Sequence, residues 1–377
     1  MKVIVNALSA KTGGIVTYTH NLMRSFAERN VDAVFAISPD FPVEVDVPVM
    51  RLAADRMSPV RRVLWEQTVW RRIVARYKPD VLYSSANFGL LFPPVPQILL
   101  VREGGLFDPF YLTNVAPALR VRTIFQRMAR RKLIIASARS SLIVLTPTNA
   151  VKGLLVSHAT DLEGRIDKNQ YGTISEFSNT SPRSRQWSED GILQLLYVSA
   201  YYPHKQPGLV SEAVADLNEQ GIACHLTLTM DLDGISETPG GDKDHFLLTK
   251  GIERGQVTML GQAPYQELPE MYKNHDVFIF PSLSETFGHP LAEAMGLGIP
   301  IIASDTPVHR EVCKDAALFF SSLSPSDLAR RVRNLDENET LRNLLTKNGQ
   351  KYVSNNFMWE SHVDRLLCVF TEITKNP

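Results

Sequence analysis

The chain has 377 residues, 44% of them hydrophobic and 21% charged, and is longer than one hydrophobic core usually serves. This composition excludes a disordered protein, and no stretch approaches the roughly 20 apolar residues of a membrane-spanning helix. The apolar run at the N-terminus is too short for a signal peptide, and the three cysteines are widely separated without metal-ligand spacing. We therefore expect two domains in a protein of the reducing cytoplasm.

The formal net charge of zero conceals two halves of opposite charge. Up to residue 175 there are 23 lysines and arginines against 13 acidic residues, and after it 17 against 27. Basic residues concentrate in two runs, 56–78 with one acid and 120–152 with none. This asymmetry predicts an anionic partner for the N-terminal half: a membrane surface, a phosphorylated acceptor or nucleic acid, with a solvated helix face as the alternative. Nucleic acid is the least favoured, because the runs contain no recognition motif.

The first half alternates short aliphatic runs with longer amphipathic ones, a pattern typical of βαβ units and a parallel sheet. The expected strands are 3–7, 33–38, 81–84, 98–102 and 142–145, and the expected helices are 15–28, 59–77 and 118–137. The polar segment 161–189 contains glycines and a proline and is typical of a linker.

The same alternation restarts after the linker. The expected strands are 193–199, 225–230, 257–261, 277–281, 299–304 and 317–320. Because the runs DVFIFP and PIIAS are continuously apolar, we expect parallel strands that are covered on both faces. The sequence thus predicts an α/β protein of two Rossmann-like parallel-sheet lobes, 1–175 and 176–356, followed by an amphipathic helix at about 357–377.

Residues 276–304, DVFIFPSLSETFGHPLAEAMGLGIPIIAS, combine a strand, a polar turn, a helix and a second strand. Gly288 tolerates backbone geometry closed to other residues, and Pro290 suits the first turn of a helix. Backbone amides at the start of such a helix bind phosphate or diphosphate. Glu285 before the helix and Glu293 within it would flank that anion, although two acids at this spacing are by themselves equally typical of a solvated helix surface.

The order of these features resembles the donor-binding signature of the retaining GT4-type glycosyltransferases of GT-B fold. The resemblance implies two Rossmann-like lobes with the active site in the cleft between them, and a C-terminal helix that packs back on the first lobe. It implies that Glu285 contacts the donor sugar, that the following amides hold the diphosphate and that Glu293 holds the ribose. The implied donor-binding residues are Gly13, Gly14, Lys205, Gly261, Gln262, Glu285, Thr286, Phe287, Gly288, His289, Leu291 and Glu293.

Two other segments carry the resemblance with departures. In LLYVSAYYPHKQPGLVSEAV, residues 195–214, Lys205 corresponds to the lysine that neutralises the donor diphosphate. Ala200 stands where the family has an arginine, and a neighbour such as His204 is the candidate replacement. Where relatives often have His-Asp, this chain has Arg102 and Glu103, which are candidates for the acceptor side and equally for an ordinary salt bridge. The predicted catalytic residues are Glu285, Lys205 and Glu103.

The resemblance implies a retaining glycosyltransferase of hexosyltransferase type. Its donor would be a UDP- or GDP-linked sugar and its acceptor a glycan or lipid-diphosphate-linked glycan of cell-surface polysaccharide biosynthesis. No cofactor is expected and no metal is required, because helix-end amides and Lys205 stabilise the leaving group. The basic lobe favours a cytoplasmic protein with peripheral contact to the anionic inner face of the membrane. A nucleotide-sugar epimerase of the same architecture and a non-catalytic nucleotide-binding scaffold remain as alternatives.

Overall fold

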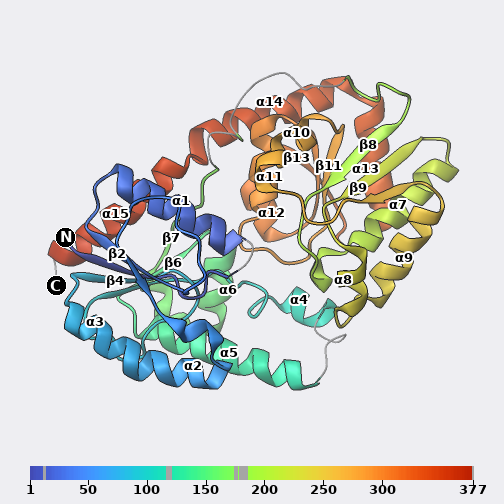
Figure 1. The fold of residues 1–377 in the computed structure, drawn as a ribbon. Coiled ribbons are helices and arrows are strands. Elements are labelled where there is room, and N and C mark those ends of the chain that lie inside the picture. The colour runs from blue at the N-terminus through green and yellow to red at the C-terminus, as the bar shows by residue number, and fades with distance from the viewer. Residues whose placement is uncertain (12–13, 116–120, 174–176, 178–185, 376–377) are drawn as a thin grey trace. The chain divides into compact units, whose positions relative to one another are not determined.

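The computed structural model describes residues 1–11, 14–115, 121–173, 177 and 186–375 (Figure 1). The chain divides into two compact units. The first unit comprises Met1–Phe107, Phe125–Gln170 and Glu360–Pro377, and the second comprises Asp108–Ile124 and Tyr171–Trp359. Each unit is built around one parallel β-sheet.

The sheet of the first unit has seven strands in the order β3-β2-β1-β4-β5-β6-β7. The strands are β1 (Val3–Asn6), β2 (Ala33–Ile37), β3 (Val49–Arg51), β4 (Val81–Ser84), β5 (Gln97–Leu100), β6 (Ile143–Thr146) and β7 (Ile166–Lys168). The helices are α1 (Gly14–Glu28), α2 (Pro59–Trp65), α3 (Arg71–Tyr77), most of α5 (Val121–Arg139), α6 (Asn149–His158) and most of α15 (Trp359–Lys375). Every residue of β1, β2, β4 and β5 is buried, as the continuously apolar runs predict.

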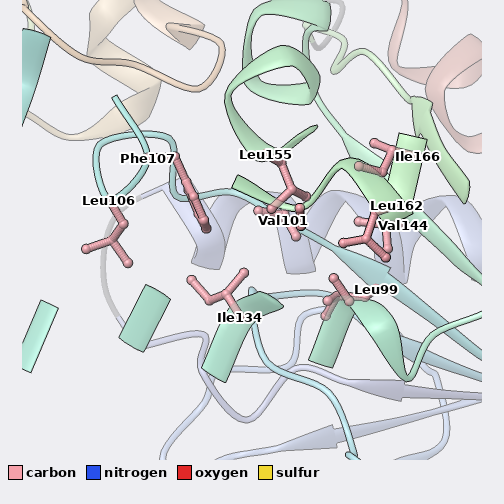
Figure 2. Close-up of a cluster of buried hydrophobic side chains, with 11 residues drawn as sticks. Leu99, Val101, Leu106, Phe107, Ile134, Val144, Leu155, Leu162 and Ile166 are labelled. Atoms are coloured by element: carbon pink, nitrogen blue, oxygen red, sulfur yellow. The ribbon is translucent and has the colours of Figure 1, made fainter. Parts of the chain in front are cut away.

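Side chains from β5, β6, α5 and α6 form one hydrophobic cluster of the first unit (Figure 2). Leu99 of β5, Ile134 of α5, Val144 of β6 and Leu155 of α6 are among its fully buried members. A second cluster around Trp70 covers β1 and β4. The helices therefore bury both aliphatic strands and their own apolar faces.

The C-terminal helix α15 belongs to this core. Its Phe370 ring lies 5.5 Å from the Tyr83 ring of β4 and 6.4 Å from the Phe26 ring of α1. The Tyr18 hydroxyl of α1 lies 3.1 Å from Nε2 of His362 and 2.7 Å from the Tyr83 hydroxyl. The apolar stripe seen in the sequence thus packs on the first helix and the sheet.

The sheet of the second unit has six strands in the order β10-β9-β8-β11-β12-β13. The strands are β8 (Leu193–Tyr197), β9 (Cys224–Leu228), β10 (Val257–Met259), β11 (Val277–Phe280), β12 (Ile301–Ser304) and β13 (Ala317–Phe320). The helices are α4 (Pro109–Asn114), α7 (Pro207–Glu219), α8 (Leu232–Glu237), α9 (Asp242–Glu253), α10 (Leu268–Lys273), α11 (His289–Leu297), α12 (Pro307–Cys313), α13 (Pro325–Glu337) and α14 (Glu339–Asn356).

The structure differs from the sequence prediction in several elements, among them the short edge strand β3, which no predicted strand covers. The edge strand β7 lies inside the predicted linker, because a three-residue strand with one buried side chain, Ile166, is too short to show a periodicity. The predicted helix 59–77 is interrupted by the π-helical segment Glu66–Trp70 between α2 and α3. The wider π turn lets Glu66 and Trp70 both face inward.

The segment Asp108–Ile124 groups with the second unit, although sequence order places it in the first lobe. Its Tyr111 and Val115 pack with Leu283 in a small buried cluster. Residues 118–120 of the predicted helix 118–137 lie outside the described residues. None of the described helices has both the length and the hydropathy needed to cross a bilayer.

Candidate functional site

The candidate site lies in the second unit, where the strand order reverses between β8 and β11. These two strands pair in parallel, so their carboxyl ends leave the same edge of the sheet. Residues 198–206 follow β8 and residues 281–288 follow β11. The Leu283 amide donates a 2.8 Å hydrogen bond to the His204 carbonyl, which joins the two loops. Open α/β sheets bind their ligands at such a switch point.

Lys205 and Glu285, one from each loop, form an ion pair in which the side chains are 11% and 15% exposed. The Tyr197 hydroxyl donates a 2.8 Å bond to the Lys205 carbonyl, and Lys205 Nζ lies 5.1 Å from the centroid of the Phe280 ring. Burial raises the pKa of Glu285, but the Lys205 ammonium, the charge of His204 and hydrogen bonds outweigh it and lower the pKa to about 2. The site therefore holds a permanent carboxylate against an ammonium.

Helix α11 begins beside this pair with free backbone donors. Its N-cap Gly288 has φ +82°, the left-handed region that favours glycine, and no described side chain caps the helix. The Leu291 amide is bonded to the Gly288 carbonyl at 2.9 Å, whereas the amides of Phe287 and Gly288 have no partner in the part of the chain that the structure describes. Unsatisfied donors and the helix dipole together favour an anion here.

Glu293 lies one turn into α11 and is buried. Its carboxyl group accepts hydrogen bonds from the hydroxyls of Tyr265, at 3.1 Å, and Tyr272, at 3.2 Å. Burial raises the pKa of Glu293 more than the two tyrosine hydrogen bonds lower it, and the net result is a pKa of about 7. Unlike Glu285, this carboxyl group has no ion-pair partner among the residues that the structure describes.

The other predicted donor residues of the second unit are more dispersed. Thr286 and His289 are half-buried, and the His289 ring stacks on the Tyr171 ring with centroids 5.1 Å apart. Gly261 follows β10 with φ +72°, and the neighbouring Gln262 is exposed. Since β9 separates β10 from β8, these two residues follow a strand that is two positions away in the sheet from the strand before Lys205.

The remaining predicted residues lie in the first unit. Gly14 begins α1, and a Cβ on it would lie 3.9 Å from Nη2 of Arg102, so these two residues are neighbours. The Arg102 guanidinium lies 5.0 Å above the Tyr18 ring. Glu103 forms an ion pair with Arg130, in which Oε2 of Glu103 lies 2.6 Å from Nη2 of Arg130. The structure thus gives Glu103 a salt-bridge partner, and its catalytic role stays a prediction; Gly13 lies outside the described residues.

Four residues at this site were not predicted from the sequence: Tyr111, Tyr265, Tyr272 and His309. The tyrosines 265 and 272 are two helical turns apart, but nothing in that spacing points to a buried carboxyl. His309 is fully buried on α12, where the sequence shows only a histidine before an arginine. No group of three or more His, Cys, Asp or Glu side chains in the described part of the chain is placed to hold a metal ion.

Residues 182–352 match a family model described as Glycosyl transferases group 1. The second unit therefore contains a group 1 glycosyl transferase domain. This domain includes the Lys205–Glu285 ion pair, the start of α11 and the buried Glu293.

Two similar proteins are glycosyltransferases by name. O-antigen chain mannosyltransferase B of Escherichia coli is 29% identical over 115 residues, which cover 30% of this chain and 30% of that protein. An uncharacterized glycosyltransferase of Methanocaldococcus jannaschii is 24% identical over 229 residues, or 60% of this chain and 61% of that protein. The matched part thus covers less than two thirds of either relative.

Solved structures share the whole fold at low sequence identity. Sucrose-phosphate synthase of Thermosynechococcus elongatus has a TM-score of 0.79 at 16% identity and full coverage of both chains. Anabaena HepE in complex with UDP-glucose has a TM-score of 0.76 at 15% identity over 99% of this chain and all of that one. A putative UDP-N-acetylglucosamine 2-epimerase of Listeria monocytogenes has a TM-score of 0.61 at 13% identity, over 100% of this chain and 97% of that one. These likenesses confirm the predicted GT-B fold of two Rossmann-like lobes, which transferases and an epimerase share.

Proposed function

We propose that the chain is a retaining GT4-type glycosyltransferase of hexosyltransferase type. It would move a sugar from a UDP- or GDP-linked donor to a glycan or lipid-diphosphate-linked acceptor in cell-surface polysaccharide biosynthesis. The group 1 domain supports this proposal, as does the O-antigen mannosyltransferase among the relatives. The observation that carries it is the Lys205–Glu285 ion pair beside the uncapped start of α11, at the strand switch point.

The chemistry follows from this arrangement. The bond between the anomeric carbon and the phosphate oxygen breaks, and its electron pair stays on the nucleoside diphosphate. Lys205 and the amides of Phe287 and Gly288 stabilise that growing charge, so a metal is not required for this role. The acceptor oxygen bonds to the anomeric carbon and its proton passes to the leaving phosphate. Glu285 remains ionised and orients sugar hydroxyls rather than attacking.

The test replaces each member of the ion pair. We expect Lys205→Ala to lose transfer at least about 100-fold, as removal of one transition-state donor does. Glu285→Ala should lose a similar amount, because the sugar hydroxyls are no longer oriented, and the circular dichroism spectrum of both variants should be unchanged. Glu270→Ala is the matched control, because that carboxylate is exposed and paired with a neighbouring lysine. Transfer is followed by mass spectrometry of products from UDP- and GDP-sugars with cell extract. Near-normal turnover by either site variant contradicts the proposal.

Incubation of the protein with the nucleotide sugar, first without and then with an acceptor, separates the proposed transferase from an epimerase and from a non-catalytic scaffold. An epimerase converts the nucleotide sugar on its own, whereas the proposed transferase needs an acceptor. A scaffold binds nucleotide and turns over nothing. Incubation with donor alone and then with extract therefore distinguishes all three.

We further propose that the protein is cytoplasmic and contacts the inner face of the membrane through a basic face of the first unit, which is formed by residues 56–78 and by α5. Exposed apolar side chains accompany its arginines and lysines; they are Val60, Leu64, Phe92, Phe125 and Met128. The single acid of residues 56–78, Glu66, is buried against Arg62, and α5 contains none. Exposed apolar groups among basic ones suit the headgroup region of an anionic bilayer better than nucleic acid.

Hydrogen bonds show that the elements of this basic face adjoin one another. Loop 88–92 lies between them: Gln67 and Arg71 on one side donate to the carbonyls of Gly89, at 3.3 Å, and Phe92, at 2.7 Å. Ser137 of α5 donates to the same Gly89 carbonyl from the other side. The loop thus lies between α3 and α5, and its Phe92 is 75% exposed.

Sedimentation with phosphatidylglycerol vesicles tests this face. We expect the wild type to bind at about 100 mM salt and to be released by high salt, since charge–charge attraction is screened. Leu64→Glu with Phe125→Glu should lower the partition coefficient at least about tenfold, because both the apolar contact and part of the charge attraction are removed. Phe246→Glu on α9 is the control, because this aromatic side chain of the second unit is also more than half exposed. Binding to duplex DNA without binding to vesicles contradicts the assignment to a membrane.

A further inference from the structure

His309 is a buried polar group that the proposed chemistry does not use. It lies in the first turn of α12, where its amide donates a 3.2 Å bond to the N-cap hydroxyl of Thr306. The residue has no exposed surface. Its ring packs against Phe280, with centroids 5.3 Å apart, and Lys205 Nζ lies over that same Phe280 ring.

The hydrogen bonds of His309 fix which ring nitrogen carries the proton. Nδ1 lies 2.9 Å from the Ser304 carbonyl and 3.0 Å from the Ser304 hydroxyl. That hydroxyl donates its own hydrogen to the Ser282 carbonyl, so both neighbours of Nδ1 act as acceptors. Nδ1 must therefore be the N–H of the ring. In a neutral imidazole this leaves Nε2 as a bare acceptor.

The acceptor Nε2 has no hydrogen-bond partner among the described residues and is shielded from water. Burial lowers the pKa of His309 to about 4, and the charges that act on it are those of Glu285, Lys205 and Asp305. The ring is thus neutral at physiological pH and cannot donate from Nε2. A buried acceptor without a partner is costly, and such groups call for an explanation.

We propose that His309 is a positioning residue for Lys205, whose ammonium donates to His309 Nε2 when a nucleoside diphosphate occupies the site. An ammonium has three N–H donors. In the structure one of them meets Glu285. With diphosphate bound, the second meets a phosphate oxygen and the third meets Nε2, so the lysine is held in one orientation toward the leaving group. The inference rests on the proposed function and adds a residue to its donor site.

The alternative is that His309 only supports the loop through the Nδ1 contact to Ser304. Two conservative variants separate these roles. Glutamine places its amide oxygen near the position of Nε2 and can accept from Lys205. Asparagine places its amide nitrogen near the position of Nδ1 and can donate to Ser304. Leucine keeps the volume and removes both functions.

The experiment measures binding of UDP and GDP by calorimetry. It also measures kcat and KM with the nucleotide sugar that gives a product in the transfer assay. We expect His309→Leu to weaken diphosphate binding about tenfold, the effect of losing a hydrogen bond to a charged group. His309→Gln should restore most of this affinity and His309→Asn should not. Urea unfolding of the same variants should give the opposite order, because asparagine restores the Ser304 contact.

A double-variant cycle gives the decisive outcome. If His309 acts through Lys205, His309→Leu has no further effect on binding in the Lys205→Ala background. Equal effects in both backgrounds, or rescue of binding by asparagine and not by glutamine, overturn the inference. A wild type that binds neither nucleotide, or a Lys205→Ala variant that binds as tightly as the wild type, refutes the proposed function instead.

Discussion

Two carboxyl groups of the same domain, the half-buried Glu285 and the buried Glu293, have opposite shifts of their pKa values. Burial is the largest influence on both Glu285 and Glu293 and raises both. Lys205 beside Glu285 reverses the effect, whereas the hydroxyls of Tyr265 and Tyr272 only moderate it at Glu293. The charge of the partner, rather than the depth of burial, decides whether the pKa of the carboxyl group falls or rises.

The raised pKa of Glu293 makes the stability of the fold depend on pH. Its pKa rises from 4.5 to about 7 on folding, so the native state binds more protons than the unfolded chain between these values. The stabilisation is fully present below pH 4.5 and is lost as pH rises through 7, up to about 3 kcal/mol. We expect Glu293→Gln, which stays uncharged, to flatten this decline in urea unfolding between pH 5 and 8.

Glu253→Gln at the end of α9 is the control for this prediction, because that acid is exposed. It should leave the pH dependence as in the wild type. An identical decline in the Glu293→Gln protein would show that other groups cause it.

At this scale the sequence could predict the charged residues but not their buried partners. Lys205 and Glu285 follow strands that the aliphatic pattern predicts, so their meeting follows from the order of the strands. Tyr272 and His309 become site residues only because packing brings them to Glu293 and Phe280. That packing depends on helix orientation, which residue spacing does not specify. Whether the predicted residues bind a donor stays a prediction.

Helix α7 shows how an element starts when its own N-cap cannot serve. Gln206 at the N-cap has φ +47° and makes no side-chain cap. Asp244 of α9 takes this role: its carboxylate accepts a 3.0 Å bond from the Gly208 amide and a 2.9 Å bond from the Tyr201 hydroxyl. A Cβ on Gly208 would lie 2.7 Å from that carboxylate, so glycine is required there.

We expect Asp244→Ala to lower the free energy of unfolding of the second unit by about 1–2 kcal/mol, the cost of a lost helix cap. Asp244→Asn should lose much less, because its amide oxygen still accepts from Gly208 and its nitrogen can donate to the Tyr201 oxygen. Urea unfolding followed by circular dichroism measures both. Equal losses for alanine and asparagine would exclude the cap as the cause.

The elements were predictable where their pattern is long and uniform. Strand β11 is a run of four apolar residues, β12 has three apolar residues followed by Ser304, and both strands are fully buried. β7 escaped prediction because one buried side chain in three residues sets no pattern. The π segment Glu66–Trp70 escaped because it changes the register within a helix whose ends look regular. Long periodic runs specify an element, whereas local changes of register depend on the neighbours it meets.

At the scale of the whole chain, two segments group with a different unit from the one that precedes them in the sequence. The segment Asp108–Ile124 joins the second unit, and Glu360–Pro377 joins the first. An amphipathic pattern shows that a helix face is buried, but not which sheet buries it. For the C-terminal helix only the family resemblance named the partner, and for α4 nothing in the sequence did. Each unit nonetheless has its own sheet and its own core, so each should unfold as a unit of its own.

We therefore expect two thermal transitions in differential scanning calorimetry, each responding to its own unit. Phe370→Ala removes a ring packed on Phe26 and Tyr83, and should lower only the transition of the first unit by roughly 10 °C, from a loss of about 3–5 kcal/mol. UDP or GDP at 100 times its Kd should raise only the transition of the second unit, since ligand at this level adds about 2.7 kcal/mol. One transition that both changes shift together would mean that the two units unfold cooperatively, and the donor site would then be stabilised by the fold of the whole chain.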